Sequence, residues 1–96
     1  MKFQSDSNAK QIVEALRERG AIVFYWRAVS RTKGVPDLIV GYGGITYLVE
    51  VKAEKGKLSE HQEKMRATWK GGPICTVRSV EGALAAVGIS QPHLDP

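Results

Sequence analysis

The fold of this chain is decided by the stretch Gly34-Val35-Pro36-Asp37, which is followed by Glu50-Val51-Lys52 across a Gly43-Gly44 turn. Apolar runs at residues 38–40 and 45–51 flank the two glycines. Gly-Gly favours a two-residue hairpin loop because both positions tolerate a positive φ. The sequence therefore predicts two antiparallel strands with Gly43 and Gly44 at the tip of their turn.

Counting back from this turn predicts which residues face one another. Directly opposed side chains have Cβ atoms about 4.5 to 5.5 Å apart, so two acids placed there repel and need a positive charge between them. Side chains alternate along a strand, which puts Glu50 and Lys52 on one face and Val51 on the other. A slip of one residue would separate the two acids by face. The predicted pairs are Tyr42 with Ile45, Val40 with Tyr47, Leu38 with Val49, and Asp37 with Glu50.

Two carboxylates and one amine on a single face suit the hydrolysis of a phosphodiester with a divalent metal. Mg²⁺ prefers hard oxygen ligands and commonly uses one or two carboxylates together with substrate phosphate and water. Asp37 and Glu50 meet that need. Simpler interpretations stay open at this point, because Asp37 after Pro36 can be turn chemistry and Glu50 with Lys52 can be an exposed ion pair.

At these residues the sequence resembles the PD-(D/E)xK nuclease superfamily, and more narrowly its VRR-NUC branch of virus-type replication and repair nucleases. The matching elements are Pro36-Asp37, Glu50-Val51-Lys52, and Gly56-Lys57-Leu58-Ser59 running to Gln62. The third element is the most specific, because a bare PD and ExK pattern is short and occurs by chance. The resemblance spans residues 8–86.

The resemblance implies a restriction-endonuclease-like α/β fold and a deoxyribonuclease that depends on Mg²⁺ or Mn²⁺. Asp37 and Glu50 would bind the metal, and the carbonyl of Val51 would add a ligand. Lys52 would position or activate the attacking water, and Gln62 would lie near the site as a further catalytic residue.

Two residues of the following helix have ordinary explanations as well. Gln62 completes a Ser59-Glu60-His61-Gln62 capping box, which accounts for it without any catalytic role. The capping and catalytic interpretations of Gln62 therefore both stay open. His61 titrates in a useful range, but a lone histidine on a charged helix is more often a surface residue.

The chain departs from the family pattern on its first helix. Many relatives carry a further acid there, which would fall at or near Ala9, and this chain has none at that position. A helix that begins near Ser7 places Glu14 opposite the apolar stripe, so Glu14 is expected on the surface. Asp6 lies nearer the expected edge but can equally be a helix cap. The polar candidates for this role are Asp6, Asn8, Gln11 and Glu14.

Composition indicates one small basic domain. Ninety-six residues allow a single core with a marginal buried fraction, which dimerisation would help. Fourteen Lys and Arg against ten Asp and Glu give a net charge of +4, which favours an anionic partner. The lone Cys75 is expected to be a buried strand thiol in a reducing compartment. With no apolar signal region and no membrane span, we expect a soluble, cytoplasmic protein.

The hydrophobic pattern predicts the element order αβββαβα for a single domain over residues 1–96, with a mixed sheet flanked by helices. Helices are expected at residues 8–19, from Ser59 toward Gly71-Gly72-Pro73, and from a Ser79 cap to about residue 87. Strands are expected at residues 21–27, in the hairpin, and at residues 74–77. Residues 28–35 form a loop, residues 53–58 a charged connector, and residues 88–96 an irregular tail.

Basic and hydroxyl side chains flank the two acids and can hold phosphates without reading bases, although they can also be ordinary solvated charges. We expect DNA to be recognised by shape through a C₂ homodimer, as in the Holliday-junction resolvases that stand-alone relatives resemble. The first hypothesis is thus a dimeric, structure-specific endonuclease for branched DNA. The alternatives are a flap or single-strand nuclease, a DNA-binding module with a degenerate site, and a partner-dependent subunit of a phage or mobile-element replication complex. The candidate DNA contacts are Arg27, Ser30, Arg31, Lys33, Lys55 and Lys57.

Overall fold

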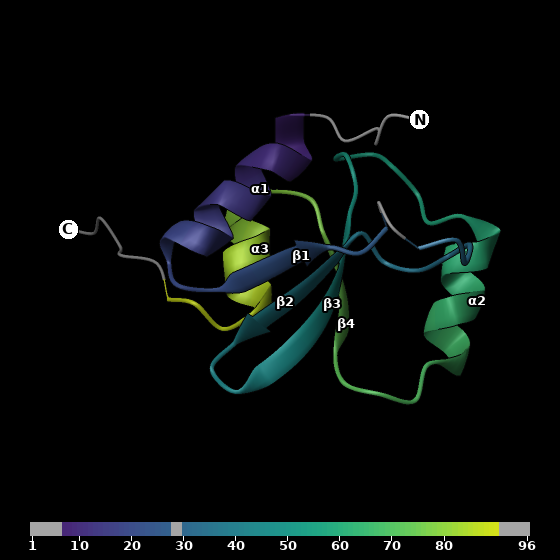
Figure 1. Cartoon of the computed structure of the whole chain (residues 1–96). Helices are drawn as coiled ribbons and strands as arrows, with labels where there is room; N and C mark the ends of the chain where they lie inside the picture. Colours follow the sequence, from purple (N-terminus) through teal and green to yellow (C-terminus); the bar gives the residue numbers. More distant parts are fainter. Residues whose placement is uncertain (1–6, 28–29, 91–96) are drawn as a thin grey trace.

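The computed structural model describes residues 7–27 and 30–90, which form three helices and one four-stranded sheet (Figure 1). Their order confirms the predicted αβββαβα arrangement of an α/β fold. No helix in these two ranges is long and apolar enough to cross a membrane. The elements are α1 (Ser7–Glu18), β1 (Ile22–Tyr25), β2 (Leu38–Tyr42), β3 (Ile45–Val51), α2 (Glu60–Thr68), β4 (Ile74–Val77) and α3 (Val80–Ala86).

The sheet is mixed, as predicted, with the strand order β1-β2-β3-β4. The first three strands are antiparallel neighbours, and β4 lies parallel to β3 because α2 carries the chain back between them. Gly43 and Gly44 form the β2–β3 turn with φ of 61° and 83°. The predicted hairpin register is confirmed at Tyr42 with Ile45, Val40 with Tyr47, and Leu38 with Val49.

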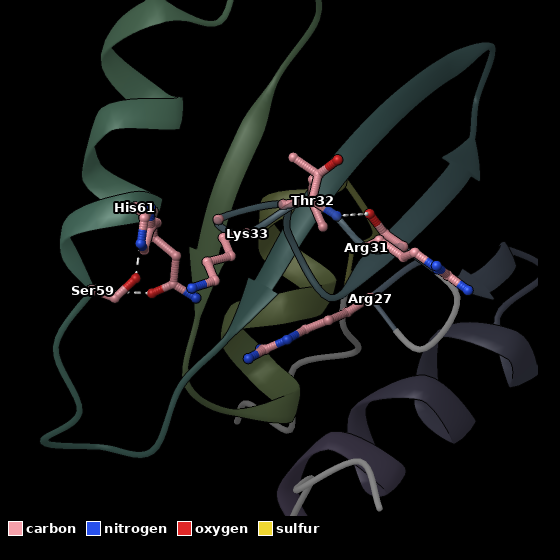
Figure 2. A pocket seen from close by; sticks show the side chains of 10 residues that line it. Arg27, Arg31, Thr32, Lys33, Ser59 and His61 are labelled. Carbon is pink, nitrogen blue, oxygen red and sulfur yellow. Dashed lines mark hydrogen bonds between the residues drawn. The ribbon is translucent and has the colours of Figure 1, made fainter. Parts of the chain in front are cut away.

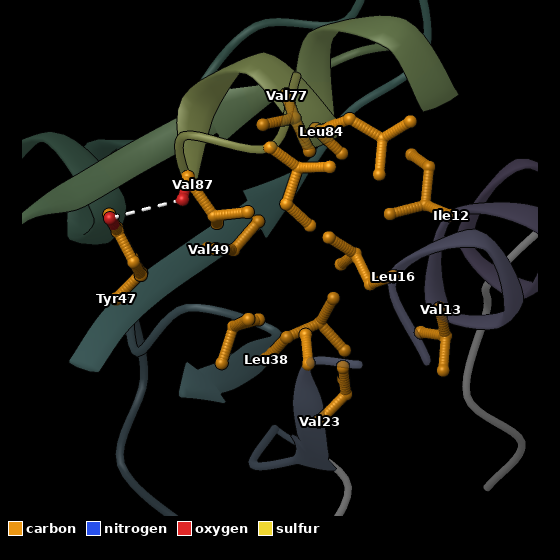
Figure 3. Close-up of a cluster of buried hydrophobic side chains, with 14 residues drawn as sticks. Ile12, Val13, Leu16, Val23, Leu38, Tyr47, Val49, Val77, Leu84 and Val87 are labelled. Carbon is orange, nitrogen blue, oxygen red and sulfur yellow. Dashed lines mark hydrogen bonds between the residues drawn. The ribbon is translucent and has the colours of Figure 1, made fainter. Parts of the chain in front are cut away.

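The hydrophobic core lies between one face of the sheet and the helix pair α1 and α3, which pack against each other (Figure 1). Inward-facing residues of all four strands meet the apolar stripes of both helices (Figure 3). The hydroxyl of the buried Tyr47 donates to the carbonyl of Val87 at 3.2 Å. The buried core residues are Ile12, Val13, Leu16, Ala21, Val23, Leu38, Val40, Tyr47, Val49, Val77, Ala83, Leu84, Val87 and Ile89.

Helix α2 lies against the opposite face of the sheet. Glu50 of β3 and Thr76 of β4 are register partners, so their side chains share a face. Each is bonded to a residue of α2, Glu50 to Gln62 and Thr76 to Arg66. Helix α2 therefore covers the part of this face around Glu50 and Thr76, while the face that carries Val49 belongs to the core.

Strand β1 is shorter than the predicted strand at residues 21–27. It ends at Tyr25 because the next two backbone N–H groups converge on one acceptor. Trp26 and Arg27 both donate to the carbonyl of Asp37, at 2.8 and 3.1 Å. This convergence ends the regular ladder and fixes the backbone of Arg27 beside Asp37.

Two other boundaries refine the predictions. Helix α2 ends at Thr68, before the predicted Gly71 boundary, because Trp69 takes an extended conformation with ψ of 132°. The tail is irregular from Gly88, as predicted, as far as the structure describes it. Ile89 within that tail is nevertheless buried, since its N–H returns to the carbonyl of Leu84 at 2.9 Å.

Candidate active site

Asp37 and Glu50, hereafter the acid pair, are buried on the face of the sheet that α2 closes. Asp37 is 3% exposed and Glu50 is 2% exposed. The Oδ2 atom of Asp37 accepts the backbone N–H of Val51 at 2.8 Å, which ties the residue before β2 to the end of β3. The predicted pair of Asp37 with Glu50 lies just beyond the β2–β3 ladder, whose register begins at Leu38 and Val49. The side chain of Asp37 bonds instead to the residue that follows Glu50.

Two positive side chains lie next to the acid pair and offset part of its negative charge. Arg27 Nη1 lies 2.8 Å from Asp37 Oδ1, and Lys52 Nζ lies 3.7 Å from Glu50 Oε2. The expectation that a positive charge accompanies the two acids is therefore met by Arg27 and Lys52. Lys52 lies two residues after Glu50 on the same strand face, which is why its amine reaches the carboxylate.

Glu50 is only partly satisfied. Its Oε2 accepts the Nε2 amide of Gln62 at 2.7 Å. Its Oε1 is buried and has no hydrogen-bond partner among residues 7–27 and 30–90. Buried carboxylate oxygens normally have partners, so Oε1 is a position where a ligand can be tested for fit. A divalent cation that prefers hard oxygen donors fits that position.

Electrostatics lead to the same conclusion. Burial, followed by the negative charge of Asp37, raises the pKa of Glu50 from 4.5 to about 7. The positive charges of Lys52 and Arg27 and the hydrogen bond from Gln62 act in the opposite direction but do not restore the ordinary value. The nearby cations therefore do not offset the cost of burying Glu50 in its ionised form, and buried carboxyls with such a raised pKa are common at functional sites.

Gln62 completes the capping box that the sequence predicted, and its side chain also contacts Glu50. Its backbone N–H donates to the hydroxyl of Ser59 at 3.1 Å, and its Oε1 accepts the N–H of Ser59 at 2.8 Å. This is the predicted capping box at the start of α2. The same side chain uses its remaining amide nitrogen to hold Glu50, so the helix cap and the acid pair share one residue.

A cavity of about 320 Å³ lies beside the acid pair. Arg27 and Gln62 both line it, and each of them is bonded to one of the two acids. Figure 2 shows Arg27 and Lys33 extending toward the wall formed by Ser59 and His61, whereas Arg31 points away from them. Four of the six candidate DNA contacts line this cavity, namely Arg27, Ser30, Arg31 and Lys33.

The loop before Asp37 reaches α2 through Gly34. This residue has φ of 90°, and a Cβ placed there would lie 2.5 Å from the carbonyl oxygen of His61. Only glycine allows this close approach of loop and helix. Thr32 and His61 also line the cavity and were not predicted as site residues. His61 is exposed, as its position on a charged helix predicted.

The other two candidate DNA contacts, Lys55 and Lys57, are exposed on the connector and do not line the cavity. The connector is held in place by Arg78, which follows β4. Its Nη1 donates to the carbonyls of Ala53 and Gly56, both at 2.7 Å. Nothing in the local sequence of Arg78 indicated this role.

The candidates for a first-helix acid separate clearly. Ala9 is buried in the apolar core, while Gln11 and Glu14 are exposed. Asn8 contacts the residue that follows β3, since its Nδ2 donates weakly to the carbonyl of Lys52 at 3.5 Å. Asp6 lies outside the described residues. Within the described ranges, no three His, Cys, Asp or Glu side chains lie close enough together to hold a metal. A metal at this site would therefore have two carboxylate side chains as ligands, those of the acid pair.

Comparison with known proteins identifies the fold. No protein-family profile matches the sequence, and no curated protein matches it. A solved structure of a VRR_NUC domain superposes with a TM-score of 0.66 and 24% sequence identity, over 86% of this chain and 96% of that one. At this identity the similarity establishes the fold. The chain therefore has the α/β, restriction-endonuclease-like fold of a VRR-NUC domain, as the resemblance of its sequence implied.

Proposed function

We propose that this chain is a divalent-metal-dependent nuclease that hydrolyses DNA phosphodiester bonds. The observation that carries the proposal is the buried acid pair with Lys52 beside it, together with a Glu50 oxygen that has no hydrogen-bond partner in the described part of the chain. These are the residues that the sequence motif predicted to bind a metal, and the chain has the fold of a VRR-NUC domain, which supports the proposal.

Asp37 and Glu50 would hold the metal, Mg²⁺ or Mn²⁺, with the carbonyl of Val51. The N–H of Val51 points to Asp37, and both backbone polar groups of a strand residue point to the same side. The carbonyl of Val51 is thus directed toward the acid pair. A divalent cation bound there would stabilise the charge that develops on the scissile phosphate.

Lys52 is the residue placed to handle the nucleophile. Its ammonium group lies at the rim of the buried acids, with 20% of its side chain exposed, so it can meet both the acids and a water from solvent. As an ammonium ion it would hold the attacking water, and as a neutral amine it would deprotonate that water. Gln62 acts indirectly, because its bond to Oε2 fixes the carboxylate of Glu50 and leaves Oε1 for the metal.

The cavity beside the acid pair would receive the DNA backbone. Basic side chains around a concave surface attract phosphates without reading the base sequence. Arg27, Ser30, Arg31 and Lys33 would act from the cavity, and Lys55 and Lys57 from the connector on the other side of Lys52. Such contacts favour recognition of a DNA shape, and a branched substrate is the one we propose.

A homodimer would present two such sites to a branched substrate. Ile22 and Phe24 of β1 are 60% and 62% exposed and point away from the core, on the same face as the acid pair. Direct pairing of two β1 edges is hindered, because Arg17 donates to the carbonyl of Val23 at 2.7 Å. The apolar face of β1 is therefore the proposed contact between two copies.

One observation favours a second candidate function. The described residues bring no third acid to the acid pair. A DNA-binding module with a degenerate catalytic site would have this composition, and it would bind DNA without cutting it.

Cleavage assays separate these functions. Labelled duplex, flap and four-way-junction DNA would be incubated with wild type, Lys52→Ala and Lys64→Ala in Mg²⁺, Mn²⁺ or EDTA at equal low salt. Lys64 is an exposed residue of α2, so its loss matches the change in charge without touching the acid pair. We expect Lys52→Ala to lose roughly 10² to 10⁴ in rate and Lys64→Ala to keep wild-type activity.

The pattern of products decides the substrate. Paired, symmetric cuts in the junction that need a divalent metal would support the dimeric resolvase-like enzyme, whereas cuts confined to flaps or single strands would reassign the substrate. Binding without cleavage in either metal would contradict the nuclease proposal and favour a binding module. Activity that appears only after a partner protein is added would indicate a subunit of a larger complex.

A further inference from the structure

We infer that, when DNA is absent, the side chain of Arg27 is bound to Asp37, the acid proposed to bind the metal. A DNA phosphate would bind Arg27 in place of Asp37, so that DNA and metal bind cooperatively. This inference rests on the proposed function and goes beyond it, since it assigns to one residue the coupling between substrate and cofactor.

Both oxygens of Asp37 are engaged in the chain as it stands. The backbone N–H of Val51 holds Oδ2, and the guanidinium of Arg27 holds Oδ1, each at 2.8 Å. The bond from Val51 belongs to the sheet and is fixed by the hairpin register. Oδ1 is therefore the oxygen that Asp37 has available for a cation, and Arg27 competes for it.

The charges around the acid pair balance without a metal. Asp37 and Glu50 contribute two negative charges, and Arg27 and Lys52 contribute two positive ones at ion-pair distance. A divalent cation added to this arrangement would lie next to the guanidinium of Arg27, which repels it. Removal of Arg27 from Asp37 would leave a more negative site and a free carboxylate oxygen.

Arg27 can leave Asp37 without disturbing the fold. Its backbone N–H donates to the carbonyl of Asp37, so the main chain stays in place while the side chain reorients. The side chain is 50% exposed and lines the cavity that also holds Lys33. A guanidinium binds a phosphate through two parallel hydrogen bonds, which makes a DNA phosphate in that cavity a strong competitor for Arg27.

Arg27 thus links the two ligands. If DNA raises the affinity for metal, then metal must raise the affinity for DNA by the same factor. Before DNA arrives the acid pair binds metal weakly, and the complete site assembles only on the substrate. Such coupling would keep the metal-loaded nuclease from forming far from DNA.

The inference is tested by measuring the affinity for Mn²⁺, without any assay of cleavage. Mn²⁺ would be titrated into wild type, Arg27→Ala, Arg27→Gln and Arg31→Ala, and the unbound ion followed by electron paramagnetic resonance. Arg31→Ala is the matched control, because it removes an equal charge from the same cavity wall while the exposed Arg31 makes no ion pair with any described residue. Arg27→Gln keeps a hydrogen-bond donor and guards against a folding defect in Arg27→Ala, and circular dichroism would confirm that each variant is folded.

We expect both Arg27 variants to bind Mn²⁺ roughly 5- to 10-fold more tightly than wild type, as loss of a competing ion pair of this kind implies, and Arg31→Ala to be unchanged. A second titration, in a Lys52→Ala background that blocks cleavage, would add a short four-way junction. The junction should tighten Mn²⁺ binding by a larger factor when Arg27 is present than in Lys52→Ala/Arg27→Ala, because a DNA phosphate also acts as a metal ligand in both proteins.

The results are separable from the proposed function. Unchanged or weaker Mn²⁺ binding in the Arg27 variants would overturn the inference and leave the metal site intact, as would an equal gain in Arg31→Ala. Absence of Mn²⁺ binding in all the proteins, with and without DNA, would overturn the metal-dependent function itself and this inference with it.

Discussion

Replacement of Glu50 by Gln tests whether the negative charge of Glu50 destabilises the metal-free fold. Glu50 is buried beside Asp37, and its pKa is raised to about 7 chiefly by burial and then by that neighbour. Glutamine keeps the shape and keeps an oxygen for the amide of Gln62, while it removes the charge. The metal-free variant should therefore gain stability relative to wild type wherever Glu50 would be ionised.

The sign follows from proton binding. Below pH 4.5 the Glu50 carboxyl is protonated in both folded and unfolded chains and contributes nothing. Between pH 4.5 and about 7 the unfolded chain releases the proton while the folded chain keeps it, so wild-type stability falls as the pH rises. At about 1.36 kcal/mol per pH unit, this window corresponds to roughly 3 kcal/mol.

Urea unfolding in EDTA at several pH values between 5 and 8 measures this effect. The quantity to follow is the unfolding free energy of Glu50→Gln minus that of wild type, because the other titrating groups cancel and any fixed cost of the new amide is independent of pH. We expect the difference to increase over this range by most of the 3 kcal/mol, and Mn²⁺ to stabilise wild type far more than the variant. A difference that stays flat or falls with pH would refute the reasoning.

Two further predictions concern the loop and the proposed dimer. Gly34→Ala should destabilise the fold by about 1 to 3 kcal/mol more than Gly44→Ala in urea unfolding. Both glycines have positive φ, but only at Gly34 would the new Cβ meet a backbone carbonyl. Equal losses of unfolding free energy in the two variants would contradict the close contact of Gly34 with α2. Phe24→Ser should weaken self-association by about tenfold or more in sedimentation experiments, whereas Ile45→Ser, an exposed apolar position on the other sheet face, should leave it unchanged. A wild-type monomer at all concentrations would exclude the dimer.

The sequence predicted best those parts of the fold that depend on local patterns. The β2–β3 hairpin follows from two glycines and alternating strands, and its register confirmed every predicted pair within the two strands. The caps at Ser59 and Ser79 were equally local and are both present. The acid pair followed because its two members lie within one residue of the ends of this hairpin.

Contacts made by long side chains across the fold could not be predicted in the same way. Arg27 was expected to meet DNA, but the partner that the fold gives it is Asp37, and this depends on β1 ending where two N–H groups converge on one carbonyl. Arg78 reaches back over more than twenty residues to the connector. An arginine in sequence shows only its charge and length, so its partner is known only once the backbone is placed.

Gln62 shows how a local motif can still carry information about the site. A capping box accepts Glu or Gln equally well, because either side chain supplies an oxygen to the N–H of the cap residue. In this fold the other terminal atom of residue 62 faces the buried Oε2 of Glu50 at 2.7 Å. A glutamate would place a second carboxylate there and repel the first, whereas the amide donates a hydrogen bond. The choice of Gln over Glu is thus explained by the acid pair and not by the helix, because only the amide can donate a hydrogen bond to the buried oxygen of Glu50.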